Sequence, residues 1–532
     1  MSIYGNSSAG VYINETDISD RIQAVSTSIG AIVGQSNYGP VNQRTLITST
    51  RQFLETFGKP DAKLTFMHYA ALAFLAESQR LYVTRVAKNA RYGGIVCRRV
   101  GNFNVSSPFT IGYDADDQTR GYTFDTRDLF IVYAKNPGAW NNELSVIIKP
   151  VTANVDDNTF IIEVYRKPSS VVIEKFTCTL NMTLDGYGKQ LQVEEQINAT
   201  SKFINVLVNF NNAIINADPT AKIINSLDGH DFEKGFNGEI VTREQAYDMV
   251  NIGWDLYSDP EEITFNIMIN GGYADPSVQL TMDSICNRRK DCIAIFDVPS
   301  YSQELQSALD YRGMMNIDSS YSALYSPDLF IVDEYNSIKL HVPPSGHVAA
   351  IYALTDRVAS AWNAPAGMNR GGLAVLGLRQ IYDQGARDAL DGSQINALRV
   401  FYGAGIKVWG SSTLQTRASA LSEISVRRLM IMLEQSIAQA ALYSVFEQND
   451  RFLRARLTSI ATGFLEPIKR GNGIYAYRVV CDDTNNTSDI IANGDTILDV
   501  YIDPALPVKR IQLSTIIAKT GAIAFSLAQL SS

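Results

Sequence analysis

A block of strand-like segments interrupts an α/β pattern in this chain. Residues 25–87 predict two strands, two helices and a third strand, and residues 236–355 predict short apolar strands that alternate with helices. Residues 88–235, between them, are rich in apolar strand-like runs separated by polar turns. We therefore expect a middle α/β domain with a partly parallel sheet, assembled from both flanking pieces, and an inserted domain that is mostly β.

The last third of the chain predicts a mixed α/β C-terminal core domain, residues 356–507. It contains two strands joined by a glycine turn at residues 403–405, two long helices and two closing strands. The fold class is therefore α+β and multidomain. In the second helix, apolar residues recur at helical spacing, namely Leu453, Leu457, Ile460 and Phe464.

Two terminal segments, residues 1–24 and 508–532, have strand character but too little apolar surface to fold alone. In the C-terminal segment, Ile511, Leu513 and Ile517 share one face of an extended chain. One side of this segment can therefore be buried against another sheet.

Net charge, apolar runs and cysteine content restrict the classes of partner and the cellular compartment that we expect. The net charge is −9, whereas general nucleic-acid binders carry basic surfaces, so no direct nucleic-acid partner is expected. No run of about 18 uncharged apolar residues occurs, so no membrane insertion is expected, and the polar N-terminus lacks a secretion signal. The five cysteines are scattered without a C-x-x-C motif, which favours reduced, buried thiols over a zinc site or a disulfide.

The stretch HVPPSGHVAAIYALTDRVASAWNAPAG, residues 341–367, combines candidate catalytic residues with prolines and glycines. A triad of Ser345, His347 and Asp356 is possible by composition, but its first two members stand two residues apart and do not face each other on a strand or a helix. P-loop, H-E-x-x-H and G-x-S-x-G motifs are absent from the sequence. We expect no enzyme, cofactor or metal site, and a cytosolic hydrolase that uses Ser345 or Cys292 is a remote alternative.

Several further stretches follow one another in a specific order. They are GVYINETD (10–17), VSTSIGAIVGQSNYGPVNQRTLITSTRQFLETFG (25–58), AKNPGAWNNELSVII (134–148), RRKDCIAIFDVP (288–299), SSYSALYSPDLFIVD (319–333), the proline-rich stretch above, INALRVFYGAGIKVWGSSTL (395–414), VRRLMIMLEQSI (426–437), VFEQND (445–450) and LDVYIDP (498–504). In this order and spacing the chain resembles the contractile tail sheath proteins of bacteriophages, a family related to the sheaths of R-type pyocins and other contractile injection systems.

The resemblance implies a structural protein without nucleotide hydrolysis. Sheath subunits polymerise with copies of themselves as stacked six-membered rings around an inner tail tube, and the sheath contracts to drive the tube through a host envelope. The implied partners are the tail tube protein, baseplate proteins and tail terminator proteins. The implied location is the virion tail, after assembly in the host cytoplasm. The sheath of a phage-like injection particle or of a secretion system is the nearest alternative.

The resemblance also assigns roles to the terminal segments and to the C-terminal core. The core would face the tube, and its helix at residues 450–466 carries Arg451, Arg454 and Arg456 off the apolar stripe. Residues 1–24 and 508–532 would be arms that add strands to sheets of neighbouring subunits. The apolar arm residues are Val11, Ile13, Ile18, Ile511, Leu513 and Ile517.

The resemblance interprets residues 341–367 as a rigid joint. Prolines fix φ, and glycines permit a close approach of the backbone or a left-handed conformation. The joint residues are Pro343, Pro344, Gly346, Pro365 and Gly367.

Overall fold

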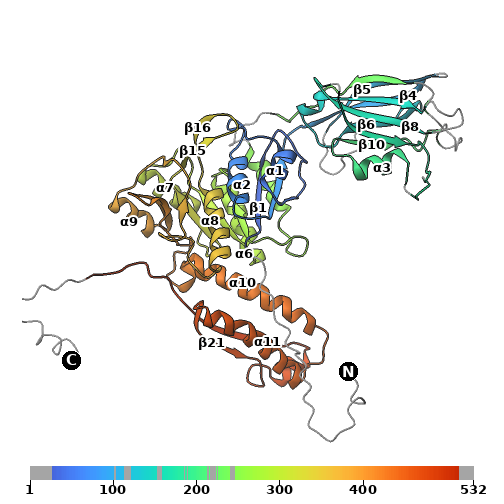
Figure 1. The fold of residues 1–532 in the computed structure, drawn as a ribbon. Helices are drawn as coiled ribbons and strands as arrows, with labels where there is room; N and C mark the ends of the chain where they lie inside the picture. The colour runs from blue at the N-terminus through green and yellow to red at the C-terminus, as the bar shows by residue number, and fades with distance from the viewer. Residues whose placement is uncertain are drawn as a thin grey trace, which may run out of the picture.

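The computed structural model describes residues 27–100, 103–112, 122–151, 159–169, 171–184, 186–188, 190–212, 226–239 and 246–513, together with Ile215 and Ile223. Its centre is a sheet in the order β17-β20-β19-β14-β13-β12-β1-β3-β2 (Figure 1). The strands from β19 to β3 in this order run parallel, and the edge strands join antiparallel. The strands are β1 (Gly30–Gln35), β2 (Thr45–Ile47), β3 (Leu81–Val86), β12 (Ile267–Ile269), β13 (Ile293–Asp297), β14 (Ser322–Ser326), β17 (Gly372–Leu373), β19 (Ile395–Phe401) and β20 (Gly405–Val408).

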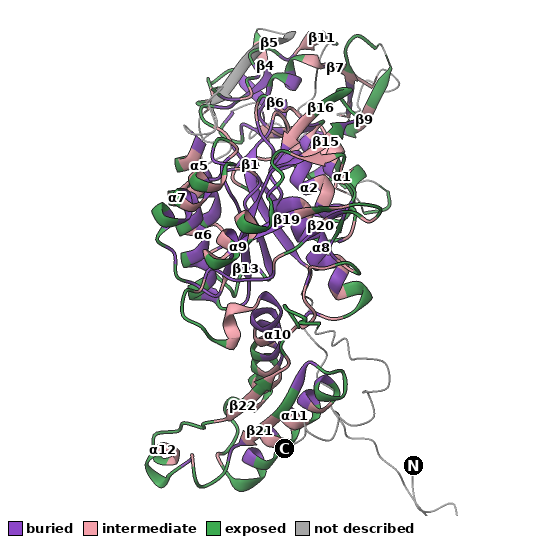
Figure 2. Ribbon diagram, turned by 90° about the vertical axis from the view of Figure 1, so that its left-hand side faces the viewer, coloured by how far each residue is buried: buried purple, intermediate pink, exposed green. Residues whose placement is uncertain are grey.

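Side chains of the central strands alternate between two apolar cores, one on each face of the sheet. In β13, Ile293 and Ile295 join one core, and Ala294 and Phe296 join the other. This two-sided burial explains why the strand has an unbroken apolar sequence. Figure 2 shows the buried residues concentrated in this central body. Helices α1 (Thr50–Phe57), α2 (Met67–Leu75) and α8 (Ser345–Val358) contribute to the first core, and α5 (Tyr247–Asp255), α6 (Pro276–Arg289), α7 (Leu305–Met315) and α9 (Gln384–Gly392) contribute to the second.

The expected β-rich insertion is present between β3 and α5, and it lies at one end of the molecule (Figure 1). Two antiparallel sheets, β10-β6-β4-β5 and β11-β7-β8-β9, share a separate apolar core. The insertion is closed at its base by reciprocal backbone hydrogen bonds between Arg91 and Phe236, at 2.9 and 3.0 Å. Its elements are β4 (Arg91–Val100), β5 (Phe103–Gly112), β6 (Asp128–Ala134), β7 (Leu144–Pro150), β8 (Phe160–Arg166), β9 (Val172–Cys178), α3 (Val193–Thr200), β10 (Ile204–Val208) and β11 (Leu227–Asp231).

The boundary expected between residues 355 and 356 falls inside α8. Strands β19 and β20 lie after it, yet β19 pairs with β14 in the central sheet. Residues 356–414 therefore share the sheet of the middle domain. A small sheet beside it contains β15 (Leu329–Asp333), β16 (Ile338–Val342) and β18 (Gly377–Leu378).

A separate C-terminal part begins with α10 (Ile424–Ala441) and projects away from the central body (Figures 1 and 2). Helix α11 (Arg451–Arg470) packs on a two-stranded antiparallel sheet of β21 (Ile474–Val480) and β22 (Asp499–Pro504). Residues of α10, α11 and β21 build its own apolar core, which includes Leu429, Phe464 and Ile474. In the part of the chain that is described, no helix combines the length and apolar character needed to cross a membrane.

Candidate functional site

The joint at residues 341–367 attaches α8 to the carboxyl end of β13. Pro344 precedes the first helical residue, Ser345, whose backbone N–H and hydroxyl each donate to the Asp297 carboxylate at 2.7 Å. The backbone N–H of Gly272 also donates to Asp297, and that of Gly271 donates to the Ser345 hydroxyl, both at 3.1 Å. This network satisfies donors at the start of the helix and fixes its position on the sheet.

Two opposing effects act on the Asp297 carboxyl. Burial disfavours its charged form, and the hydrogen bonds from Ser345 favour that form. Burial dominates and raises the pKa of Asp297 to about 7. The folded protein therefore retains a proton on this group at pH values where the unfolded chain has released it.

The free energies of unfolding of the native protein and of Asp297→Asn should differ in their dependence on pH because of this proton. The native contribution to stability is complete below the ordinary pKa of an aspartate and is lost as pH rises to about 7. Asparagine does not titrate, so the stability advantage of the native protein should shrink by up to about 1.4 kcal/mol per pH unit between pH ~4 and ~7. Denaturant unfolding at several pH values measures the difference. An advantage that grows with pH would show that the carboxylate is ionised in the folded state.

The close approach of two helices explains the glycine of the joint. A Cβ atom added at Gly346 would lie 2.2 Å from the Cα of Ala70, so α8 and α2 can pack this closely only with glycine there. At the other end of the joint, Pro365 is buried. Gly367 has a φ of 91°, and its N–H donates to the carbonyl of Val408 at 2.9 Å. Both ends of the joint are thus held against the central body.

The candidate catalytic residues do not form a triad. The Ser345 hydroxyl binds Asp297, and His347 follows in the same helix. Asp356 instead pairs with Arg428 at 2.6 Å. The alternative nucleophile, Cys292, is fully buried. The geometry therefore gives the hydrolase alternative no support.

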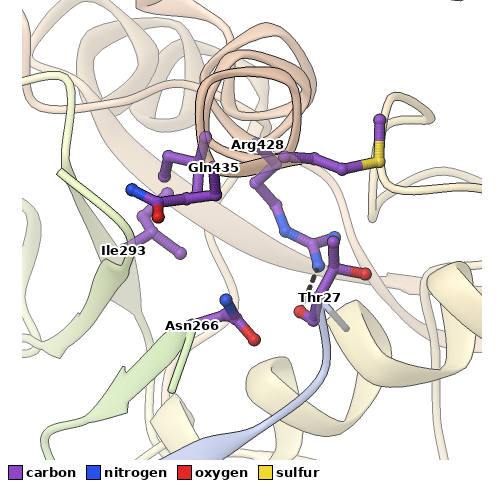
Figure 3. Close-up of a pocket in the computed structure, with 7 residues that line it drawn as sticks. Thr27, Asn266, Ile293, Arg428 and Gln435 are labelled. Carbon is purple, nitrogen blue, oxygen red and sulfur yellow. Dashed lines mark hydrogen bonds between the residues drawn. The ribbon is translucent and has the colours of Figure 1, made fainter. Parts of the chain in front are cut away.

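Asp356 belongs to a second cluster, at the root of the predicted N-terminal arm. Figure 3 shows Arg428 and Thr27 of this cluster, joined by a hydrogen bond. The guanidinium of Arg428 is almost completely buried and stacks on the ring of Tyr352, with its central carbon 4.8 Å from the ring centroid. Thr27, the first described residue, donates its hydroxyl to Asp356 at 2.7 Å, and its backbone carbonyl accepts a bond from Arg428 at 3.2 Å. The ion pair thus links the arm root to both α8 and α10. Arg428 was not predicted as a site residue, although the adjacent arginines Arg427 and Arg428 in an apolar helix were a signal.

The root of the predicted C-terminal arm is also attached to the body. Lys509 pairs with Glu423 at 2.5 Å and donates to the Ser412 hydroxyl at 3.1 Å. Beyond this contact, Ile511 and Leu513 are 88% and 87% exposed. The other predicted arm residues, Val11, Ile13, Ile18 and Ile517, lie outside the described residues.

The three arginines of α11 that were predicted to contact the tube have different environments. Arg451 and Arg456 are exposed, whereas Arg454 is 6% exposed. The Arg454 guanidinium donates to Asp483 at 3.1 Å and to the Asn449 side chain at 2.9 Å. The loop after β21 covers this side of the helix, so a position off the apolar stripe is not exposed here. Arg454 therefore stabilises the C-terminal part and is not available to a partner.

Family models match most of the second half of the chain. The phage tail sheath protein central domain matches residues 255–414, and the phage tail sheath C-terminal domain matches residues 416–518. Their division falls between β20 and α10, where the C-terminal part leaves the central body.

Proteins of similar sequence are also phage tail sheath proteins, in agreement with the family models. The tail sheath protein of Enterobacteria phage T4 is 24% identical over 97% of this chain and 98% of its own length. The tail sheath protein of Vibrio phage KVP40 is 31% identical, over 51% of this chain and 44% of its own length. Its match therefore spans less than half of that relative.

Solved structures share the fold. The sheath of an extracellular contractile injection system, the PVC sheath complex in its contracted state, has a TM-score of 0.55 at 16% identity and covers 97% of this chain and 98% of that one. A sheath tail protein from Listeria innocua has a TM-score of 0.56 at 11% identity, with coverage of 91% and 97%. These structures show the shared fold, and the two family models together with the sequence relatives show that the chain belongs to the family of contractile tail sheath proteins.

Proposed function

We propose that this chain polymerises as stacked six-membered rings around an inner tail tube and that contraction of the polymer drives the tube through a host envelope. The match to a phage tail sheath protein over nearly the whole of both chains carries this proposal. The tail tube, baseplate and tail terminator proteins are the partners, and assembly in the host cytoplasm places the protein in the virion tail. The same role in a phage-like injection particle is the alternative, to which the contractile injection system sheath corresponds in fold.

Strand exchange between subunits is the proposed linkage. The sheet of β21 and β22 has only these two strands among the described residues, so each strand has an outer edge open to pairing. Two-stranded sheets are marginally stable alone, and an added strand would extend the ladder. The exposed Ile511 and Leu513 stand at the start of an arm that can supply such a strand.

Electron microscopy of the purified full-length protein tests the proposal directly. Long tubes of uniform diameter with six-fold end views are the expected result. A small soluble oligomer under all assembly conditions, including the presence of the tube protein, would contradict it.

Arg451 and Arg456, two exposed arginines in the first half of α11, are the proposed tube contact. Reversal of both charges, Arg451→Glu with Arg456→Glu, should reduce co-assembly with the tail tube protein at least roughly tenfold at low salt, because steering between opposite charges is lost. The defect should diminish at high salt. Sedimentation of sheathed tubes measures it. The control is a second double variant, Lys59→Glu with Arg288→Glu, which makes the same change in net charge. Both of these residues are exposed on the central body. Equal sedimentation of both double variants would exclude the arginines from the contact.

A further inference from the structure

Two thiols contact each other inside the central body. Cys286 lies near the end of α6, and Cys292 immediately precedes β13. Their Sγ atoms are 3.4 Å apart, and both side chains are fully buried. Both are free thiols in this structure.

The chain around this pair is arranged for a bond between the two sulfurs. Lys290 caps the end of α6; it has a left-handed φ of 60° and donates its N–H to the carbonyl of Cys286 at 2.8 Å. This cap turns the chain back, so Cys292 returns to the side of Cys286 after five intervening residues. The sulfurs need to move from 3.4 Å to the disulfide distance of about 2.05 Å. The Met268 sulfur, 3.3 Å from that of Cys286, provides an adaptable wall for this movement.

We propose that Cys286 and Cys292 form a disulfide when the protein leaves reducing surroundings, with a small peroxide as the oxidant. One thiolate attacks a peroxide oxygen, so that an S–O bond forms, the O–O bond breaks and hydroxide leaves. The second sulfur then attacks the resulting sulfenic acid, an S–S bond forms, and the oxygen leaves as water with the proton of the second thiol. The two thiols lose two electrons, and hydrogen peroxide is reduced to two waters.

Burial determines the rates of the two steps. It raises the pKa of the Cys286 thiol, so little thiolate is present and the first step is slow. The second step is fast because the other sulfur is already in contact. Water-sized peroxide can enter during local opening that excludes bulkier disulfide reagents. The bond fastens α6 to β13. Formation of this disulfide in an assembled particle rests on the proposed function, because a virion tail acts outside the reducing cell that makes it.

Peptide mapping of the full-length protein tests the proposal. The folded protein is incubated with hydrogen peroxide, unfolded in an alkylating reagent and digested with trypsin, which cleaves between the two cysteines after Arg288, Arg289 and Lys290. The peptides of Cys286 and Cys292 should be joined with the loss of two hydrogens, and the thermal midpoint should rise by about 5 °C and return on reduction. The other cysteines, Cys97, Cys178 and Cys481, should carry the alkyl label.

Matched variants connect the stability change to this pair. Cys292→Ser should abolish the rise in thermal midpoint, and Cys481→Ser should retain it. Recovery of Cys286 and Cys292 as alkylated thiols, their separate conversion to sulfinic acids, or a bond to another cysteine would overturn the proposal. The mapping uses the native protein, so a variant that does not fold leaves the test intact. Absence of tubes in a protein that forms the bond would count against the proposed function alone.

Discussion

Replacement of Leu513 with aspartate should prevent tube formation and leave the thermal midpoint of the free subunit unchanged. Leu513 is 87% exposed in the subunit, so the new charge is solvated there. In the proposed polymer the same side chain lies on the face of the arm that a neighbouring sheet buries. Burial of an unpaired charge costs several kcal/mol, and this cost recurs at every junction between subunits. Electron microscopy and sedimentation measure assembly, and a thermal melt measures the subunit.

Gln512→Asp is the matched control, because neighbouring residues of a strand point to opposite faces. It adds the same charge to the same exposed segment, and tubes should still form. Tube formation by Leu513→Asp at the native concentration would exclude this strand from the linkage. Unfolding of the Leu513→Asp subunit would show that the arm completes its own core, contrary to strand exchange.

Elements with local signals could be predicted from the sequence. Helix α1 ends at Gly58, as its sequence predicts, and this glycine has a φ of 79°. The turn between β19 and β20 uses Gly403 and Gly405 at φ of 76° and 75°. Each feature depends on a few adjacent residues, so the sequence carries it directly.

Pairing between distant strands could not be predicted in the same way. Strand β19 pairs with β14 through Leu324 and Ile395. The apolar sequence of each strand does not specify the strand with which it pairs. The sequence pattern placed a domain boundary between residues 355 and 356, but the central sheet continues past it. Tertiary pairing therefore determines the extent of the central body.

For individual site residues, too, local backbone preferences could be predicted from the sequence, whereas the tertiary surroundings of a side chain could not. The joint at residues 341–367 was a prediction from the family resemblance, in which the intrinsic backbone preferences of proline and glycine supplied the physical reason. The burial of Arg454 depends on Asp483, which lies in a loop 29 residues further along the chain. Helical spacing located Arg454 off the apolar stripe, but it could not show what covers that side of α11.

Gly346→Ala should be the most damaging small substitution in the central body. Its Cβ would lie 2.2 Å from the Cα and 2.6 Å from the carbonyl oxygen of Ala70, and backbone atoms cannot move aside as a flexible side chain can. Helix α8 must then separate from α2, which costs about 3 kcal/mol or more because the shared core is opened. Gly313→Ala in α7 is the control, since no atom lies within 4 Å of its added Cβ. Alanine favours a helix over glycine, so Gly313→Ala should stabilise the protein by roughly 0.5–1 kcal/mol. Thermal and denaturant unfolding should therefore shift in opposite directions for these two substitutions. Equal shifts would mean that α8 is not held against α2, and the joint would then not be rigid.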